Sequence, residues 1–122
     1  MKRGGRIKPK KRTASEKERI YGPKARVEFV KSLRCANCGL RASEHSGWIE
    51  VVNAHIENGG SGRKADYTSI IPLCTTIYAT GCHDIQHRHG WSNLTKLSAQ
   101  EQREAAAAAT ERAWQAYQLS LS

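Results

Sequence analysis

Residues 70–87, IIPLCTTIYATGCHDIQH, are the stretch that decides the fold. The first four residues are apolar and fit a strand, and Pro72 confines that strand to the edge of a sheet or marks its end. Between Gly81 and Gly90 the chain contains no helix breaker, which predicts a short helix that Gly90 ends. The stretch therefore predicts a strand and a helix that are joined by a loop.

A second strand is predicted earlier in the chain. Residues 48–56, Trp-Ile-Glu-Val-Val-Asn-Ala-His-Ile, are rich in β-branched side chains. The glycine-rich segment 58–62 ends this run. We therefore expect the two strands to form a hairpin with a long loop.

Helices are predicted before this hairpin. Thr13 and Ser15 are each followed three residues later by a glutamate, which is the capping-box pattern of a helix start. Gly22-Pro23 interrupts the helix, because proline disfavours helical geometry in the residue before it. A second helical run is expected over about residues 24–33.

A helix is also predicted after the hairpin. Ser98 and Glu101 repeat the capping-box pattern, and the five consecutive alanines that follow have the highest helix propensity. Together these patterns predict an α+β fold. Its parts are a basic tail at 1–12, an N-terminal helical region at 13–34, a core at 35–91 and a C-terminal helix at 92–122.

The positive charge of the chain is concentrated at its start. The net charge of +9 favours a polyanionic partner, and residues 1–12 carry seven basic residues without an acidic one. This composition predicts a segment that stays disordered until it binds nucleic-acid phosphates, with a solubilising arm as the alternative. The basic residues of the tail are Lys2, Arg3, Arg6, Lys8, Lys10, Lys11 and Arg12.

The composition also bears on the compartment. No stretch of about 20 apolar residues is present, and the basic N-terminus lacks the apolar segment of a secretory signal. We therefore expect a cytoplasmic protein with no membrane contact.

The four cysteines predict a structural zinc site. Cys35 and Cys38 form a C-x-x-C pair followed by glycine, and in a reducing compartment such pairs are more often metal ligands than disulfides. Cys74 and Cys82 would complete four thiolates around tetrahedral zinc, although seven residues between two ligands exceed the usual two to four. Residues 75–81 would then have to loop out. Buried free thiols are the alternative, and a redox C-x-x-C is disfavoured because the chain lacks a βαβ pattern.

Three histidines form the second signal. His83 and His87 are four residues apart, so they share one face of the predicted helix and both imidazoles can reach one metal ion. His55 ends the first strand just before the glycine-rich turn, where its side chain could face the same helix. This outline, strand, loop, strand and helix, is typical of a single-metal nuclease site.

Here the sequence resembles the HNH or ββα-metal endonucleases, in particular their short phage and prophage members. The resemblance covers about residues 33–91, and the order and spacing of its blocks make it specific. The blocks are Cys35-Ala-Asn-Cys38-Gly39, Asn53-Ala54-His55-Ile56, Gly59-Gly60-Ser61-Gly62-Arg63-Lys64-Ala65-Asp66, Ile71-Pro72-Leu73-Cys74 and Cys82-His83-Asp84-Ile85-Gln86-His87-Arg88.

The resemblance implies a small ββα-metal finger that hydrolyses DNA phosphodiester bonds in a bacterial host cell, leaving a 5′-phosphate and a 3′-hydroxyl. His55 would be the general base, for which a neutral imidazole is suited at physiological pH. His83 and His87 would hold one divalent cation, Mg²⁺, Mn²⁺, Ni²⁺ or Zn²⁺, against the scissile phosphate.

Two positions depart from the family pattern. Many members carry a further metal ligand just before the base, where this chain has Ala54. The cation would then keep an extra water or use another ligand, and His55 itself is one alternative. The asparagine that orients the base is also not evident. Asp66 is the best substitute, since a carboxylate that accepts from one imidazole nitrogen fixes the tautomer, and Tyr67 and Ser69 remain alternatives.

Further basic residues are predicted to contact the DNA backbone. Arg63 and Lys64 follow the glycine turn, and Arg88 follows the two histidines, so all three could flank a bound phosphate; a solvated loop is the alternative. A rival to the nuclease is a zinc-knuckle nucleic-acid-binding adaptor without catalysis, in which the histidines complete a structural site. The adaptor needs one zinc ion, whereas the nuclease needs a second, exchangeable cation.

Overall fold

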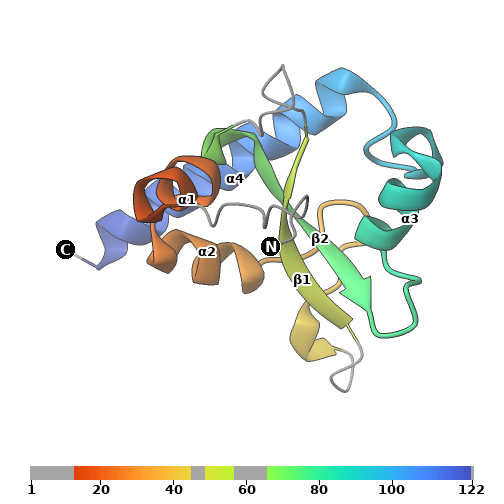
Figure 1. The fold of residues 1–122 in the computed structure, drawn as a ribbon, viewed down its shortest axis with the longest axis horizontal. Coiled ribbons are helices and arrows are strands. Elements are labelled where there is room, and N and C mark those ends of the chain that lie inside the picture. Colours follow the sequence, from red (N-terminus) through yellow and green to blue (C-terminus); the bar gives the residue numbers. More distant parts are fainter. Residues whose placement is uncertain (1–12, 45–48, 57–65, 122) are drawn as a thin grey trace, which may run out of the picture.

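The computed structural model describes residues 13–44, 49–56 and 66–121. Within these ranges, helices and a two-stranded antiparallel sheet confirm the predicted α+β class (Figure 1). The elements are α1 (Ala14–Tyr21), α2 (Lys24–Lys31), β1 (Ile49–His55), β2 (Ile70–Thr76), α3 (Cys82–His89) and α4 (Gln100–Ser120), with short 3₁₀ turns η1 (Ala42–Glu44), η2 (Tyr67–Ser69) and η3 (Trp91–Asn93).

The hairpin of β1 and β2 is the centre of the fold. The register places Ala54 opposite Ile71 and His55 opposite Ile70. The second strand is longer than predicted and continues past Pro72 to Thr76. Proline is tolerated there because the carbonyl of Pro72 accepts from the N–H of Ala36 at 2.8 Å, so its nitrogen faces the outer edge, away from β1.

The first helix begins as the sequence predicts, and the last one does not. Thr13 and Glu16 form the capping box, with the Glu16 N–H donating to Thr13 Oγ1 at 3.2 Å. The predicted box of Ser98 and Glu101 is wrong. The cap is Ala99, whose N–H donates to Gln102 Oε1 at 2.9 Å, because a glutamine one residue further along serves equally well as the acceptor.

The helices cover the hairpin from different sides. In Figure 1, α1 and α2 lie on one side of the strands, α3 lies on the other, and α4 crosses from the α3 side to the α1 and α2 side. Ala54 is buried in the core cluster that also contains Ile71, Cys82 and Ala107. Asn53, one residue away on β1, instead donates to the carbonyl of Val27 in α2 at 3.2 Å. Strand alternation therefore turns Ala54 toward α3 and α4.

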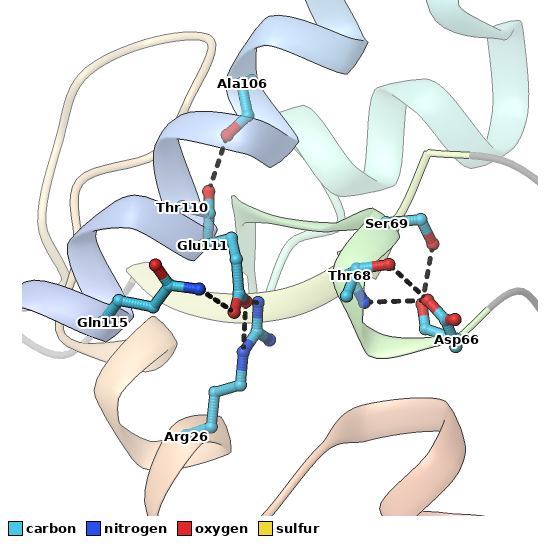
Figure 2. A network of polar contacts seen from close by, with 8 residues as sticks. All are labelled: Arg26, Asp66, Thr68, Ser69, Ala106, Thr110, Glu111 and Gln115. Atoms are coloured by element: carbon cyan, nitrogen blue, oxygen red, sulfur yellow. Dashed lines mark hydrogen bonds and ion pairs between the residues drawn. The ribbon is translucent and has the colours of Figure 1, made fainter. Parts of the chain in front are cut away.

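A buried arginine connects the helices behind the sheet. The Arg26 side chain is fully buried and pairs with Glu111 of α4 at 2.9 Å (Figure 2). Its guanidinium also lies 5.0 Å from the ring centre of Tyr67 in η2. Removing one partner from a buried ion pair leaves an uncompensated charge, which typically costs about 3–5 kcal/mol, so this pair fixes how α2, α4 and η2 meet.

The longest helix does not have the character of a membrane span. None of the helices in the described ranges combines the length and the apolar composition that crossing a bilayer requires.

Candidate metal centre and active-site residues

The four cysteines come together at one point in the fold. All are free thiols, and the sulfurs of Cys35, Cys38, Cys74 and Cys82 lie within 4.8 Å of one another. The sulfurs of Cys38 and Cys74 are 3.7 Å apart, far beyond a disulfide bond. Four sulfurs at about 2.3 Å from a tetrahedral zinc ion are about 3.8 Å apart. The cluster therefore has the ligand type, number and spacing of a site that can hold a metal ion such as zinc.

The first pair of cysteines sits in a tight turn after α2. The turn closes through the N–H of Gly39, which donates to the carbonyl of Cys35 at 2.9 Å, and Gly39 has a positive φ of 80° that favours glycine. The N–H groups of Asn37 and Cys38 point at Cys35 Sγ over 3.4 and 3.5 Å. These donors stabilise a thiolate at Cys35.

The second pair joins the end of β2 to the start of α3. The N–H of Cys82 donates to Cys74 Sγ at 3.3 Å. The two chain segments approach closely here, because a Cβ atom on Gly81 would lie 2.5 Å from the carbonyl oxygen of Cys74. The predicted loop over residues 75–81 is shorter in the structure, because Thr75 and Thr76 still pair with β1 and the chain leaves the strand only at Ile77. Ile77 and Tyr78 are about two-thirds exposed. The long spacing is therefore compatible with one cluster.

Asp84 holds the base of this loop closed. Its carboxylate accepts from Thr75 Oγ1 at 2.8 Å, from the N–H of Thr76 at 3.1 Å and from the N–H of Gly81 at 2.9 Å. Partial burial opposes ionisation of Asp84, but these hydrogen bonds outweigh it and lower the pKa of the carboxyl group. Asp84 thus ties the first turn of α3 to the end of β2.

The thiols of the cluster shift one another's pKa through hydrogen bonds. Hydrogen bonds from the side chains of Cys74 and Cys82 lower the pKa of Cys35 far below its ordinary value. The same interaction with Cys35 raises the pKa of Cys82 to about 11. The Cys35 thiol therefore ionises more readily than that of Cys82, and binding of a metal ion would release the protons that remain on the cluster.

Asn37 is a contact of the cluster that sequence reasoning missed. Its Nδ2 donates to Cys82 Sγ at 3.3 Å, while its Oδ1 accepts from the N–H of Lys96 at 2.9 Å. The main-chain N–H of Lys96 can only donate, so it must contact the oxygen of the Asn37 amide. The NH₂ group of that amide therefore faces the sulfur of Cys82. The residue lies inside the C-x-x-C pair, but no local pattern reveals that its side chain reaches a cysteine 45 positions away.

The two helix histidines lie side by side, as their spacing predicts. Nε2 of His83 and Nε2 of His87 are 3.2 Å apart, and the rings meet edge to face with centroids 4.5 Å apart. Two nitrogens that bind one cation at about 2.0–2.1 Å, with an angle of about 100° between them, are themselves about 3.2 Å apart. His83 is half-buried and His87 is exposed, so an ion between them would meet solvent.

His55 contacts α1 rather than α3. Its Nε2 lies 2.7 Å from the carbonyl oxygen of Ile20, and its ring packs edge to face against Tyr21 with centroids 5.2 Å apart. A carbonyl can only accept, so Nε2 carries the proton in the neutral ring and Nδ1 carries the lone pair. A main-chain oxygen therefore fixes the tautomer, which no side-chain motif could have indicated.

Asp66 caps the 3₁₀ turn η2. Its Oδ1 accepts from the N–H and the hydroxyl of Thr68, at 3.0 and 2.5 Å, and its own carbonyl accepts from Ser69 Oγ at 2.9 Å (Figure 2). The hydrogen bond from the Thr68 side chain is the largest of the effects that lower the pKa of Asp66, and the nearby charge of His55 contributes. The role of Asp66 in orienting His55 stays a prediction.

The described residues do not bring His55 to the histidine pair of α3, and its role as a third metal ligand stays a prediction. Within the described ranges, the cysteine cluster is the one group of three or more His, Cys, Asp or Glu side chains close enough to share an ion. The reason is strand alternation: Ala54 faces the core beside α3, so the neighbouring His55 turns to α1. In the part of the chain that the structure describes, β1 therefore brings no third metal-ligating side chain to His83 and His87.

The predicted phosphate contacts are placed only in part. The guanidinium of Arg88 is exposed and donates to the carbonyl of Ala79 in the loop before α3. The remaining basic residues predicted to bind nucleic acid lie outside the described ranges. They are Arg63, Lys64, Lys8, Lys10, Lys11 and Arg12.

Comparison with known proteins gives no relative. The chain matches no family model, no curated protein and no solved structure.

Proposed function

We propose that this chain is a metal-dependent endonuclease of the HNH type that hydrolyses phosphodiester bonds in DNA. The observation that carries the proposal is the 3.2 Å separation of Nε2 of His83 and Nε2 of His87. This pair stands on a helix whose first residue, Cys82, belongs to the sulfur cluster. A structural zinc at the cysteines would anchor the start of the helix, and the exposed histidine pair would hold a second ion.

The histidine pair suits an exchangeable catalytic cation. A divalent ion bound there would stabilise the negative charge that develops on the phosphate oxygens in the transition state. Because Ala54 supplies no ligand, two neutral imidazoles leave several coordination positions for water and for substrate oxygens. Such a site favours a labile ion over a permanent one.

His55 would act as the general base. This role requires the substrate phosphate to lie at the end of β1, because the His55 ring packs on the α1 side of the hairpin while the histidine pair stands on α3. The contact of Nε2 with the Ile20 carbonyl leaves Nδ1 as the basic nitrogen of the neutral ring. In the proposed reaction the oxygen of a water molecule bonds to phosphorus and its proton moves to Nδ1 of His55. The bond from phosphorus to the 3′ oxygen breaks, and that oxygen takes up a proton from solvent. The net charge of +9 favours DNA as the polyanionic substrate.

The decisive experiment is a cleavage assay on zinc-loaded protein. Supercoiled plasmid and single-stranded DNA are incubated with and without Mg²⁺, Mn²⁺ or Ni²⁺. We expect nicking or linearisation that depends on the added ion and is lost in His87→Ala. His89→Ala is the matched control, because this exposed histidine is also in the last turn of α3 and should leave cleavage intact. Undiminished cutting by His87→Ala, or no cutting with any ion, would overturn the proposal.

One observation favours the rival adaptor: the position before His55 is a buried alanine instead of a ligand. A zinc-knuckle adaptor would bind DNA and one zinc ion per chain, and titration would detect no second ion at His83 and His87. Zinc analysis combined with a Mn²⁺ titration therefore separates the two functions independently of the choice of DNA.

A further inference from the structure

A hollow of about 450 Å³ lies where α1 meets α2. The residues that line it include the apolar Ala14 and Val27 and the aromatic Tyr21. Lys17 and Lys24 line it from the two helices, and both are exposed. The volume lies within the range of about 300–1,000 Å³ that is usual for small-ligand sites.

The hollow adjoins His55. The Tyr21 ring that lines it is the ring that packs against the His55 imidazole at 5.2 Å. The bend between the helices is fixed by Gly22, which has a φ of 86° and lies so deep that a Cβ would come 3.2 Å from the ring of Tyr67. The hollow is therefore preformed rather than created by a mobile segment.

Charge around the hollow favours an anion. Among the residues that line the hollow, Lys17 and Lys24 are basic and Glu18 is acidic. In the sequence, the tail with its seven basic residues ends at Arg12, two positions before Ala14, which lines the hollow. A lining with apolar residues, an aromatic ring and two lysines matches the base and the phosphates of a nucleotide.

We propose that this hollow binds one nucleotide of a single DNA strand, with the base stacked against Tyr21 and its flanking phosphates near Lys17 and Lys24. In a duplex each base is paired and stacked between its neighbours, so a hollow lined by a single aromatic side chain suits an unpaired base. The identification of DNA rests on the proposed function. The consequence is that the chain prefers single-stranded or locally opened DNA next to the scissile phosphate.

Fluorescence anisotropy of a labelled oligothymidine and of a duplex of equal length tests this preference. The protein keeps its zinc and no divalent ion is added, so binding is measured without cleavage. Stacking of a base on an aromatic side chain accounts for about a 5- to 150-fold difference in affinity. We expect Tyr21→Ala to lose about that factor for the single strand, and Tyr21→Phe to bind like the native chain.

Two controls separate stacking from a damaged fold. Tyr117→Ala removes a half-exposed aromatic ring from α4, away from the hollow, and should not change binding. Circular dichroism should show equal helicity for all variants. An oligonucleotide with 2-aminopurine among the thymines adds a direct readout, since quenching on stacking should persist in Tyr21→Phe and disappear in Tyr21→Ala.

The lysines provide a second test that leaves the core untouched. Lys17→Ala with Lys24→Ala should lower the slope of log affinity against log salt by about 1.4, which is about 0.7 for each phosphate contact on a single strand. Lys96→Ala, an exposed lysine in the loop before α4, should leave the slope unchanged.

The outcomes of the binding and cleavage experiments are independent. Equal single-strand affinity in the native chain and Tyr21→Ala, or an equal loss on duplex DNA, overturns the nucleotide site even where the protein cleaves DNA. Tyr21-dependent binding by a chain that cleaves nothing with any ion supports the nucleotide site and rejects the nuclease.

Discussion

The side-chain amide of Asn37 joins the sulfur of Cys82 to the main chain of Lys96, by hydrogen bonds of 3.3 and 2.9 Å. One side chain thereby connects the first cysteine turn, the start of α3 and the segment before α4. A donor to a thiolate offsets part of its charge and holds the ligand in place, so the contact stabilises the metal-bound form.

We expect Asn37→Ala to weaken zinc binding by about 10- to 100-fold, the usual cost of losing a partner of a metal ligand. Competition with a chromophoric chelator measures the affinity. Asn93→Ala is the matched control, because it removes an amide that donates to the carbonyl of His89 at 2.8 Å, away from the sulfurs. Native zinc affinity in Asn37→Ala would show that the residue only tethers the loop.

Gly81→Ala should release the metal from the cysteine cluster. The backbone of Gly81 is in an ordinary conformation, with φ −74°, but a Cβ would lie 2.5 Å from the Cys74 carbonyl oxygen and 2.6 Å from the Cα of Thr75. Backbone atoms cannot move aside cheaply, so the first turn of α3 must separate from β2 and carry Cys82 away. Zinc content after dialysis and the helical signal should both fall.

Gly90→Ala is the comparison for this variant. Gly90 has a φ of 85°, which strains any other residue by about 1–3 kcal/mol, yet nothing lies within 4 Å of its would-be Cβ. It should therefore lower the melting temperature while zinc stays bound. Equal zinc content in both variants would contradict the close approach of Gly81 to Cys74.

His55→Ala tests the proposed general base. Loss of a general base typically slows the chemical step by about 10²–10⁴-fold, so the single-turnover rate at saturating DNA should fall in that range. DNA affinity and helicity should stay near native, because the ring is only half-buried at the end of β1. A variant that cuts at the native rate would remove His55 from the mechanism.

Asp66→Asn decides which group orients His55. Asparagine still accepts a hydrogen bond at the start of η2, so the fold should survive. Since the Ile20 carbonyl already lies 2.7 Å from His55 Nε2, we expect the cleavage rate to fall less than about tenfold, below the usual effect of a general base. A loss as large as that of His55→Ala would instead assign the orienting role to the Asp66 carboxylate.

The sequence predicts those parts of this protein that depend on local patterns. The strand of β-branched residues ending at His55, the breaker-free helix after Gly81 and the capping box of Thr13 are each written within a few neighbouring residues. The cysteines could be grouped as well, because a C-x-x-C pair and two further thiols leave few other roles in a small domain.

Contacts between distant residues escape such patterns. Arg26 reads as a solvated charge on α2, yet its side chain is fully buried because Glu111, 85 positions later, arrives on α4. His55 hydrogen-bonds to the main-chain oxygen of Ile20, and because every residue type carries such an oxygen, no side-chain pattern indicates the contact. The face on which His55 lies depends on which helix covers which side of the hairpin, and this follows from packing of the whole domain.

Cys82 and His83 are consecutive residues in the first turn of α3. In the proposed enzyme the two metal centres are therefore linked thermodynamically. Zinc that orders this turn raises the affinity of the histidine pair for its cation, and by reciprocity the cation raises the affinity for zinc by the same factor. Depletion of cellular zinc would then lower nuclease activity without altering any group that touches DNA. The zinc supply would thereby regulate binding of the catalytic cation.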